Sequence, residues 1–203
     1  MEYVREYVYL GSVLVPSSTF TEATNKLYQK ALKAMHRLSR LLDQDVQNVQ
    51  TMLYAFDHTI KPILLYGAEV WGPMTASKLS KEFDLETRYD NQKCSILELK
   101  FMKILLHVKR NTANLAVRGE LGRHPLTMYA IMAGIKYYYK ILGKNEHSLV
   151  KEAMKENIKI HHQGINTWYS KLTEIMKQLK IPFPQASSIN MTCIAQTKLI
   201  KGT

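Results

Sequence analysis

The chain has 203 residues, 46% of them apolar, and a formal net charge of +11, which suits one domain or two small ones with a core of ordinary size. No window approaches the roughly 18 consecutive apolar residues of a transmembrane helix, and the acids among the first six residues do not suit a secretory leader. We therefore expect an intracellular protein of the cytoplasm or nucleus, without a membrane partner.

The positive charge is concentrated in the second part of the chain. Residues 1–72 contain seven Lys or Arg and seven Asp or Glu, whereas residues 73–203 contain 21 and ten. Within the second part, residues 100–144 contain nine bases and a single acid, Glu120. A requirement for solubility alone would not concentrate the charge in this way. The distribution therefore predicts a polyanionic partner.

The N-terminal residues predict a hairpin followed by a helix. Residues 3–15 alternate and are rich in Tyr and Val, with a Gly-Ser pair in the middle, which is typical of a short β-hairpin. A helix is predicted over about 22–42, with Ser18 or Thr21 as its cap.

A second helix and a kink are predicted next. Asp45 is the expected cap, and one helical face is formed by Val46, Val49, Leu53, Phe56 and Ile60. Pro62 predicts a break or kink, because proline lacks a backbone donor and clashes with the preceding turn. The apolar stretch that follows contains Tyr66 and Trp71, which we expect to be two aromatic core anchors.

The second part predicts a connector and a helical region. Residues 73–91 are only weakly periodic. Further helices are predicted at 92–108, from a cap at Asn111 or Thr112 to Leu121, from Pro125 to about Leu142, at 147–159 and at 167–180. Gly122 suits the left-handed position that ends a helix. The sequence thus predicts a mainly α fold with a small hairpin, divided into 1–16, 17–72, the connector 73–91, a basic helical part 92–180 and a flexible tail 181–203.

Five bases of the first predicted helix form what we call the basic row: Lys26, Lys30, Lys33, Arg37 and Arg40. At ~100° per residue they lie within an arc of ~80°, and an apolar stripe runs about 110° away. No acid interrupts the row. Exposed faces usually mix signs, because like charges four residues apart repel each other. We therefore interpret the row as a contact for phosphates, with an ordinary solvated face as the alternative.

Other bases are weaker candidates for binding nucleic acid: Lys100, Lys103, Lys109, Arg110, Arg118, Arg123, Lys136 and Lys140. The turn around Gly122 is typical of a helix-turn-helix, although a helical hairpin that only packs the fold is the commoner arrangement. Next to Lys136 and Lys140 stand three tyrosines, 137–139, and such interleaving suits single strands. We expect Tyr137 to be a core residue and leave the other two open.

Three strings, at 6–12, 57–72 and 114–126, resemble the C-terminal region of reverse transcriptases from non-LTR (LINE-type) retrotransposons, in the same order. The resemblance implies the end of the palm, a helical thumb-like bundle and a basic helical C-terminal extension. It implies a primer-grip-like hairpin at Tyr9, Leu10 and Gly11. Its implied partners are an RNA or RNA/DNA duplex and the missing palm and fingers of the polymerase.

The chemistry of that family is absent from the sequence. Its polymerases hold two metal ions on paired aspartates, and this chain contains no Asp-Asp pair. Magnesium would belong to the missing palm, and no histidine or cysteine has a partner at zinc-ligand spacing. We therefore expect no catalytic residue, no metal site, no cofactor and no polymerase activity in this chain. The alternative function is a helical protein–protein interaction domain whose charge serves solubility.

Overall fold

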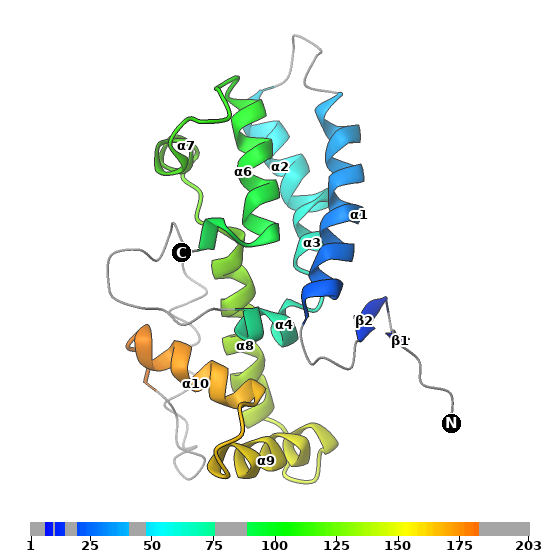
Figure 1. The fold of residues 1–203 in the computed structure, drawn as a ribbon, viewed down its shortest axis with the longest axis vertical. Helices are drawn as coiled ribbons and strands as arrows, with labels where there is room; N and C mark the ends of the chain where they lie inside the picture. Colours follow the sequence, from blue (N-terminus) through cyan, green and yellow to red (C-terminus); the bar gives the residue numbers. More distant parts are fainter. Residues whose placement is uncertain (1–6, 10, 15–19, 41–47, 76–88, 183–203) are drawn as a thin grey trace. The chain divides into compact units, whose positions relative to one another are not determined.

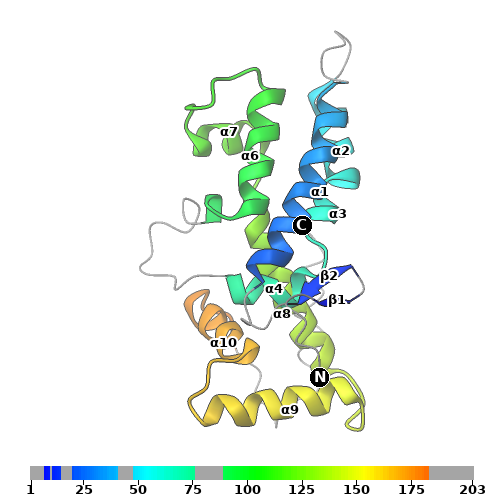
Figure 2. The ribbon, with the colours of Figure 1, turned by 45° about the vertical axis from the view of Figure 1, so that its right-hand side comes forward.

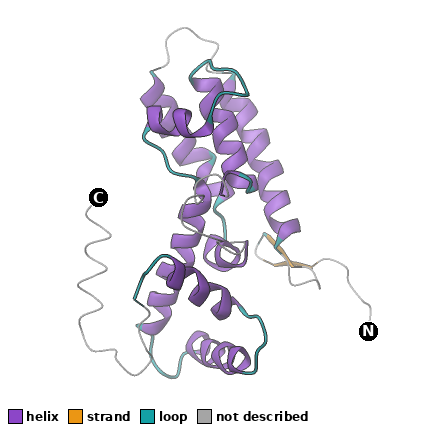
Figure 3. Ribbon diagram, turned by 60° about the vertical axis from the view of Figure 1, so that its left-hand side comes forward, coloured by secondary structure: helices purple, strands orange, loops and turns teal. Residues whose placement is uncertain are grey.

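The computed structural model describes residues 7–9, 11–14, 20–40, 48–75 and 89–182. Most of the expected tail, most of the expected connector, and Leu10 of the primer-grip-like hairpin lie outside these residues. The described chain is mainly helical, as Figure 3 shows, so the predicted mainly α fold is confirmed. The chain divides into two compact units, residues 1–134 and 135–203, and each is described by itself.

The first unit begins with two short strands. β1 (Tyr7–Tyr9) and β2 (Ser12–Leu14) pair antiparallel, with Val8 opposite Val13. Gly11, at φ +80°, supplies the left-handed conformation that the turn between them requires. The described helices of this unit are α1 (Thr21–Ser39), α2 (Val49–Thr59), α3 (Lys61–Leu64), α4 (Ala68–Thr75), α6 (Lys93–Leu105), α7 (Asn114–Leu121) and the first part of α8 (Leu126–Leu142).

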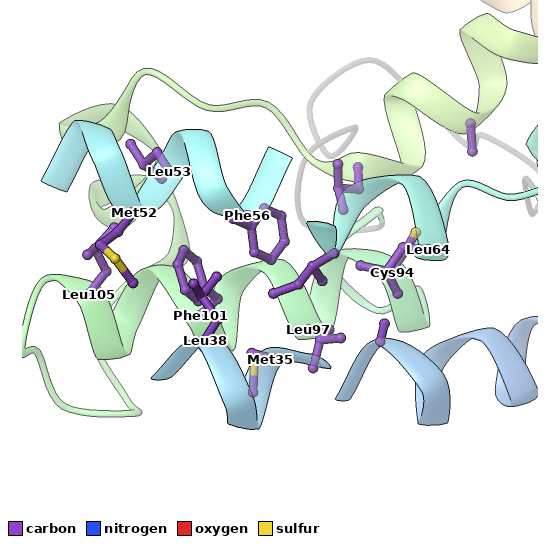
Figure 4. Close-up of a cluster of buried hydrophobic side chains, with 14 of the residues drawn as sticks. Met35, Leu38, Met52, Leu53, Phe56, Leu64, Cys94, Leu97, Phe101 and Leu105 are labelled. Atoms are coloured by element: carbon purple, nitrogen blue, oxygen red, sulfur yellow. The ribbon is translucent and has the colours of Figure 1, made fainter. Parts of the chain in front are cut away.

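The core of the first unit lies between α1, α2 and α6, which run side by side in Figures 1 and 2. Figure 4 shows the buried side chains of these helices converging. Phe56 of α2 stacks on Phe101 of α6, with ring centroids 4.7 Å apart. Leu97 of α6 and Met35 of α1 are fully buried in the same cluster. Helices that the sequence division assigned to separate regions thus share one core, because the apolar stripes of α1 and α6 face each other.

The two expected aromatic anchors behave differently. Trp71 is 5% exposed, and its Nε1 donates a hydrogen bond to the carbonyl oxygen of Tyr66 at 2.9 Å. Tyr66, in contrast, is 47% exposed. The position of Tyr66 is therefore corrected from the core to the surface: its backbone satisfies the buried indole, while its side chain stays in contact with water.

Several helix ends differ from the sequence expectation. The cap of α2 is Asn48, whose side chain accepts a hydrogen bond from the backbone N–H of Gln50, and not Asp45, which lies outside the described residues. Neither α1 nor α7 has a side-chain cap bond. Gly122 does end α7 at φ +61°. Pro62 lies in the first turn of α3, where a missing N–H costs nothing.

A close crossing joins α4 to the first part of α8. A Cβ built on Gly72 would lie 2.3 Å from the carbonyl oxygen of Ala130, and one on Gly134 would lie 2.3 Å from Cγ of Pro73. Any larger residue at either position would collide with its neighbour. The two glycines are therefore needed for the space they leave between the helices, and not for an unusual backbone angle.

The second unit contains the last part of α8 together with α9 (Leu149–His162) and α10 (Trp168–Gln178). Ser148 caps α9, and Thr167 forms a capping box with Ser170 at the start of α10. Tyr138 is 1% exposed, and burial raises the pKa of its hydroxyl. The core tyrosine of the triplet is thus Tyr138 and not Tyr137, whose half-buried ring meets Trp168 edge to face.

Candidate nucleic-acid interface

The basic row lies on the exposed side of α1. All five of its residues are exposed, whereas the opposite side of the helix is buried through Ala23, Leu27, Ala31, Met35 and Leu38. The row extends ~21 Å along the helix at 1.5 Å per residue. One side of α1 therefore anchors the helix in the core, and the other presents five cations in line to solvent.

A groove of about 580 Å³ runs beside α6 in the same unit. We call it the α6 groove. Its apolar lining comes from Tyr28 of α1, from Ile96, Leu99 and Ile104 of α6, and from Val108 just after α6. Its basic lining comes from Lys100, Lys103 and Arg110, three of the bases that the sequence singled out.

The α6 groove and the basic row use different sides of α1. Tyr28, which lines the groove, lies ~160° around the helix from the centre of the row at ~100° per residue. Lys93 extends over the Tyr28 ring at 5.4 Å from its centroid. The first unit therefore carries two separate cationic surfaces, one purely charged and one with an apolar floor.

Arg118 belongs to neither surface. Its side chain is 3% exposed and its guanidinium donates to Asp90 Oδ1 at 2.7 Å and to Glu98 Oε2 at 2.9 Å. Asn114 Nδ2 donates to Asp90 Oδ2 at 3.0 Å, and the N–H of Leu126 donates to Glu98 Oε2 at 3.1 Å. We call these groups the Arg118 cluster. Arg118 is therefore removed from the predicted nucleic-acid contacts, because both of its carboxylate partners hold it inside the fold.

The Arg118 cluster ties three helices together. Glu98 belongs to α6, Arg118 to α7, and Leu126 begins α8. Burial raises the pKa of Glu98, while the hydrogen bonds from Arg118 act in the opposite direction. Desolvation is the largest effect on the pKa of Glu98 because its side chain is removed almost completely from water.

Arg123 is also reassigned. Its Nη1 donates to the carboxylate of Asp57 at 2.8 Å, and the two side chains are 18% and 26% exposed. This ion pair raises the pKa of the guanidinium. Arg123 thus connects the turn after α7 to α2. The neighbouring His124 is exposed.

The remaining predicted bases are at the surface. Lys109 is exposed in the first unit, and Lys136 and Lys140 are exposed in the second. Lys103 is half-buried, and its Nζ donates to the carbonyl oxygen of Arg110 at 2.8 Å, which fixes the segment that ends the α6 groove. Of the primer-grip-like residues, Tyr9 ends β1 and the exposed Gly11 forms the turn.

Two aromatic contacts of the first unit were not predicted from the sequence. Tyr54 is 66% exposed, and the centroid of its ring lies 3.8 Å from that of the His58 ring. Lys61 Nζ lies 4.0 Å from the centroid of the Tyr129 ring. The i, i+4 spacing of Tyr54 and His58 gives a signal for their contact. No sequence signal joins Lys61 to Tyr129, which belongs to a different helix.

The described residues give no support for metal binding or for a membrane-spanning helix. Within the described residues no group of three His, Cys, Asp or Glu side chains is placed to bind a metal ion. No described helix is both long enough and apolar enough to cross a bilayer. Comparison of the chain with protein-family models, with curated proteins and with solved structures gives no match.

Proposed function

We propose that this chain is a non-catalytic, nucleic-acid-binding part of an RNA-directed DNA polymerase of the non-LTR retrotransposon type. Its thumb-like helices would grip a template–primer duplex or the RNA of the element. The observation that carries the proposal is the basic row, five exposed cations in line on a helix whose other side is anchored in the core. The likeness of the strings at 6–12, 57–72 and 114–126 to that family supplies the identity of the ligand.

The cations of the basic row repel one another. Cations at i, i+4 repel each other, so an uninterrupted row costs free energy in the isolated helix. A polyphosphate backbone reverses this cost, because each neutralised phosphate releases a condensed counterion. A rigid helix face ~21 Å long can follow a backbone over several phosphates. Sequence-independent binding with a strong dependence on salt is the expected result.

The catalytic partner would be the missing palm and fingers of the polymerase. In the resembling family two metal ions on the palm lower the barrier to chemistry, and a thumb only positions the duplex. We expect purified chain to show no polymerase activity with any template, primer or divalent metal. Polymerase activity of the purified chain would contradict this part of the proposal.

The direct test is the salt dependence of duplex binding. If about five phosphates are neutralised, the plot of log affinity against log salt should have a slope near −4 to −5. The measurement needs an RNA/DNA duplex with a fluorescent label and a titration at several salt concentrations. A slope near zero, or no binding at low salt, would exclude the proposal.

The second candidate function is a helical protein–protein interaction domain without a nucleic-acid role. A different observation favours it, namely the apolar floor of the α6 groove with Ile96 and Ile104 exposed at 41% and 37%. The same duplex titration separates the two functions, because an interaction domain whose charge serves only solubility would give a weak, shallow salt dependence.

A further inference from the structure

The α6 groove combines an apolar floor with positively charged side chains, whereas a phosphate backbone needs only the positive charge. Ile96 and Ile104 are 41% and 37% exposed, and they stand eight residues apart on α6. At 1.5 Å per residue their separation is ~12 Å, about two turns of a helix. Val108, 36% exposed, continues the apolar line beyond the end of α6. This is the length over which a short amphipathic helix places apolar side chains at i, i+4 and i+7.

The charge around this apolar line is positive. Lys100, Lys103 and Arg110 line the groove, and Asp90 is the one acid among the described residues that do so. The carboxylate of Asp90 is already neutralised, because Arg118 and Asn114 both donate hydrogen bonds to it. Lys103 donates a hydrogen bond to the carbonyl oxygen of Arg110 and so holds the segment that ends the groove. The cations of the groove thus have no acid of their own within the described lining.

We propose that the α6 groove binds an acidic amphipathic helix of a partner protein. Apolar side chains of the partner would cover Ile96 and Ile104, and its Asp or Glu side chains would meet Lys100 and Arg110 at the rim. Charge complementarity and the apolar floor together select this occupant. A nucleic-acid strand would satisfy the cations but would leave the isoleucines against sugar and phosphate. The proposal does not depend on the proposed function, since the groove and the basic row use different sides of α1.

The probe is a synthetic helical peptide of about 16 residues, with Leu at i, i+4, i+7 and i+11 and Glu beside each Leu. Two controls have the same length, one with the order scrambled and one with every Glu replaced by Gln. We expect the full chain to bind the first peptide saturably, as measured by fluorescence anisotropy, and to bind each control about tenfold or more weakly. Equal binding of the scrambled peptide would overturn the proposal.

Variants of the chain locate the binding. Ile96→Asp with Ile104→Asp should weaken the peptide about tenfold or more, and because both positions are exposed the fold should be kept. Leu115→Asp is the matched control, since Leu115 is 55% exposed on α7 and does not line the groove. A loss of binding in this control equal to that in the double variant would overturn the assignment.

A competition experiment separates peptide from nucleic acid. The Lys30, Lys33 and Arg37 to Gln variant should bind the peptide like the unchanged chain, whether or not it binds duplex. A short RNA should not displace the peptide at salt concentrations where the peptide stays bound. Displacement of the peptide by RNA under these conditions would show that the groove is a nucleic-acid site, and would overturn the peptide proposal.

Discussion

Arg118 and the basic row are built from the same kinds of residue, yet the fold uses them in opposite ways. The row keeps its five cations exposed along α1. Arg118 is 3% exposed and saturated by two carboxylates and is the centre of a cluster that joins α6, α7 and α8. A local excess of bases in the sequence is therefore not a measure of the positive surface, because acids from distant segments can neutralise part of that charge inside the fold.

The largest effect that tests this comparison should come from Arg118→Met. Removing one partner of a buried ion pair leaves the other charge without compensation and costs about 3–5 kcal/mol. Here Asp90 and Glu98 would both lose their partner. We expect the free energy of unfolding, measured with urea, to fall by about that amount. Protein that remains folded should keep the salt slope of duplex binding. An unchanged urea midpoint would mean that the cluster does not stabilise the fold.

The next effect concerns the basic row, through replacement of Lys30, Lys33 and Arg37 by Gln. Gln keeps the helix propensity, so stability should change by no more than about 0.5 kcal/mol. Duplex affinity should fall on the order of 100-fold at low salt, and the log–log slope should flatten by about three units.

The matched control for the row replaces Lys100, Lys103 and Lys109 by Gln. It removes the same number of charges from another surface of the same unit, so the affinity should change less than in the row variant. If instead this control abolishes duplex binding while the row variant does not, the row is a solvated helix face.

A smaller effect is expected from Glu98→Gln, which keeps the shape of the cluster and removes one of its two negative charges. Stability at pH 7 should change by only about 1 kcal/mol, because two effects oppose each other. The variant loses the attraction between Glu98 and Arg118, but it also loses the cost of burying the charge of Glu98. Burial raises the pKa of Glu98 above its ordinary value of 4.5, so the folded state binds this proton more readily than the unfolded state.

The pH dependence follows from that direction. The unchanged chain should gain stability relative to the Gln variant as the pH falls through the raised pKa toward about 4.5. Urea titrations of both proteins between pH 7 and 4.5 measure the difference between their free energies of unfolding. The other carboxyl groups contribute equally to both proteins, so their contributions cancel in this difference. If the unchanged chain instead lost stability relative to the Gln variant over this range, the pKa of Glu98 would be lowered in the fold.

The smallest effect should come from Arg123→Gln. The pair with Asp57 is partly exposed, and pairs of this kind contribute about 1 kcal/mol or less. Lys61 remains 3.8 Å from the same carboxylate and compensates in part. Thermal unfolding should therefore show a small shift that raised salt reduces, and the salt slope of duplex binding should not change. A flattened slope would return Arg123 to the nucleic-acid contacts.

The parts of the fold that periodicity controls were predictable from the sequence. The stripe of Leu27, Ala31 and Leu38 in α1 and that of Leu97, Phe101 and Leu105 in α6 are buried, as a 3.6-residue repeat requires. The exposed position of the basic row follows from the same geometry. These features need only neighbours within a few turns of one helix.

The features that failed depend on contacts between distant segments. The partners of Arg118 stand 28 and 20 residues before it in the chain, at Asp90 and Glu98, and no local pattern pairs them. Tyr66 lies in a dense apolar stretch, but Gly67, at φ +65°, turns the chain just after it, and the side chain ends outside the core. Local patterns thus predicted which face of a helix is apolar, but not which charges neutralise each other across the fold.

The crossing of α4 and α8 sets a rule for how this chain can change over evolutionary time. A Cβ added to Gly72 or to Gly134 would lie 2.3 Å from an atom of the facing helix, and at Gly72 that atom belongs to the backbone. Substitution of Gly72 is therefore not tolerated unless the two helices move apart. Substitution of Gly134 requires a compensating change at Pro73. In any set of related chains, positions 73 and 134 should vary together and position 72 should not vary at all. That pattern would identify true relatives even where the surface charges have been replaced.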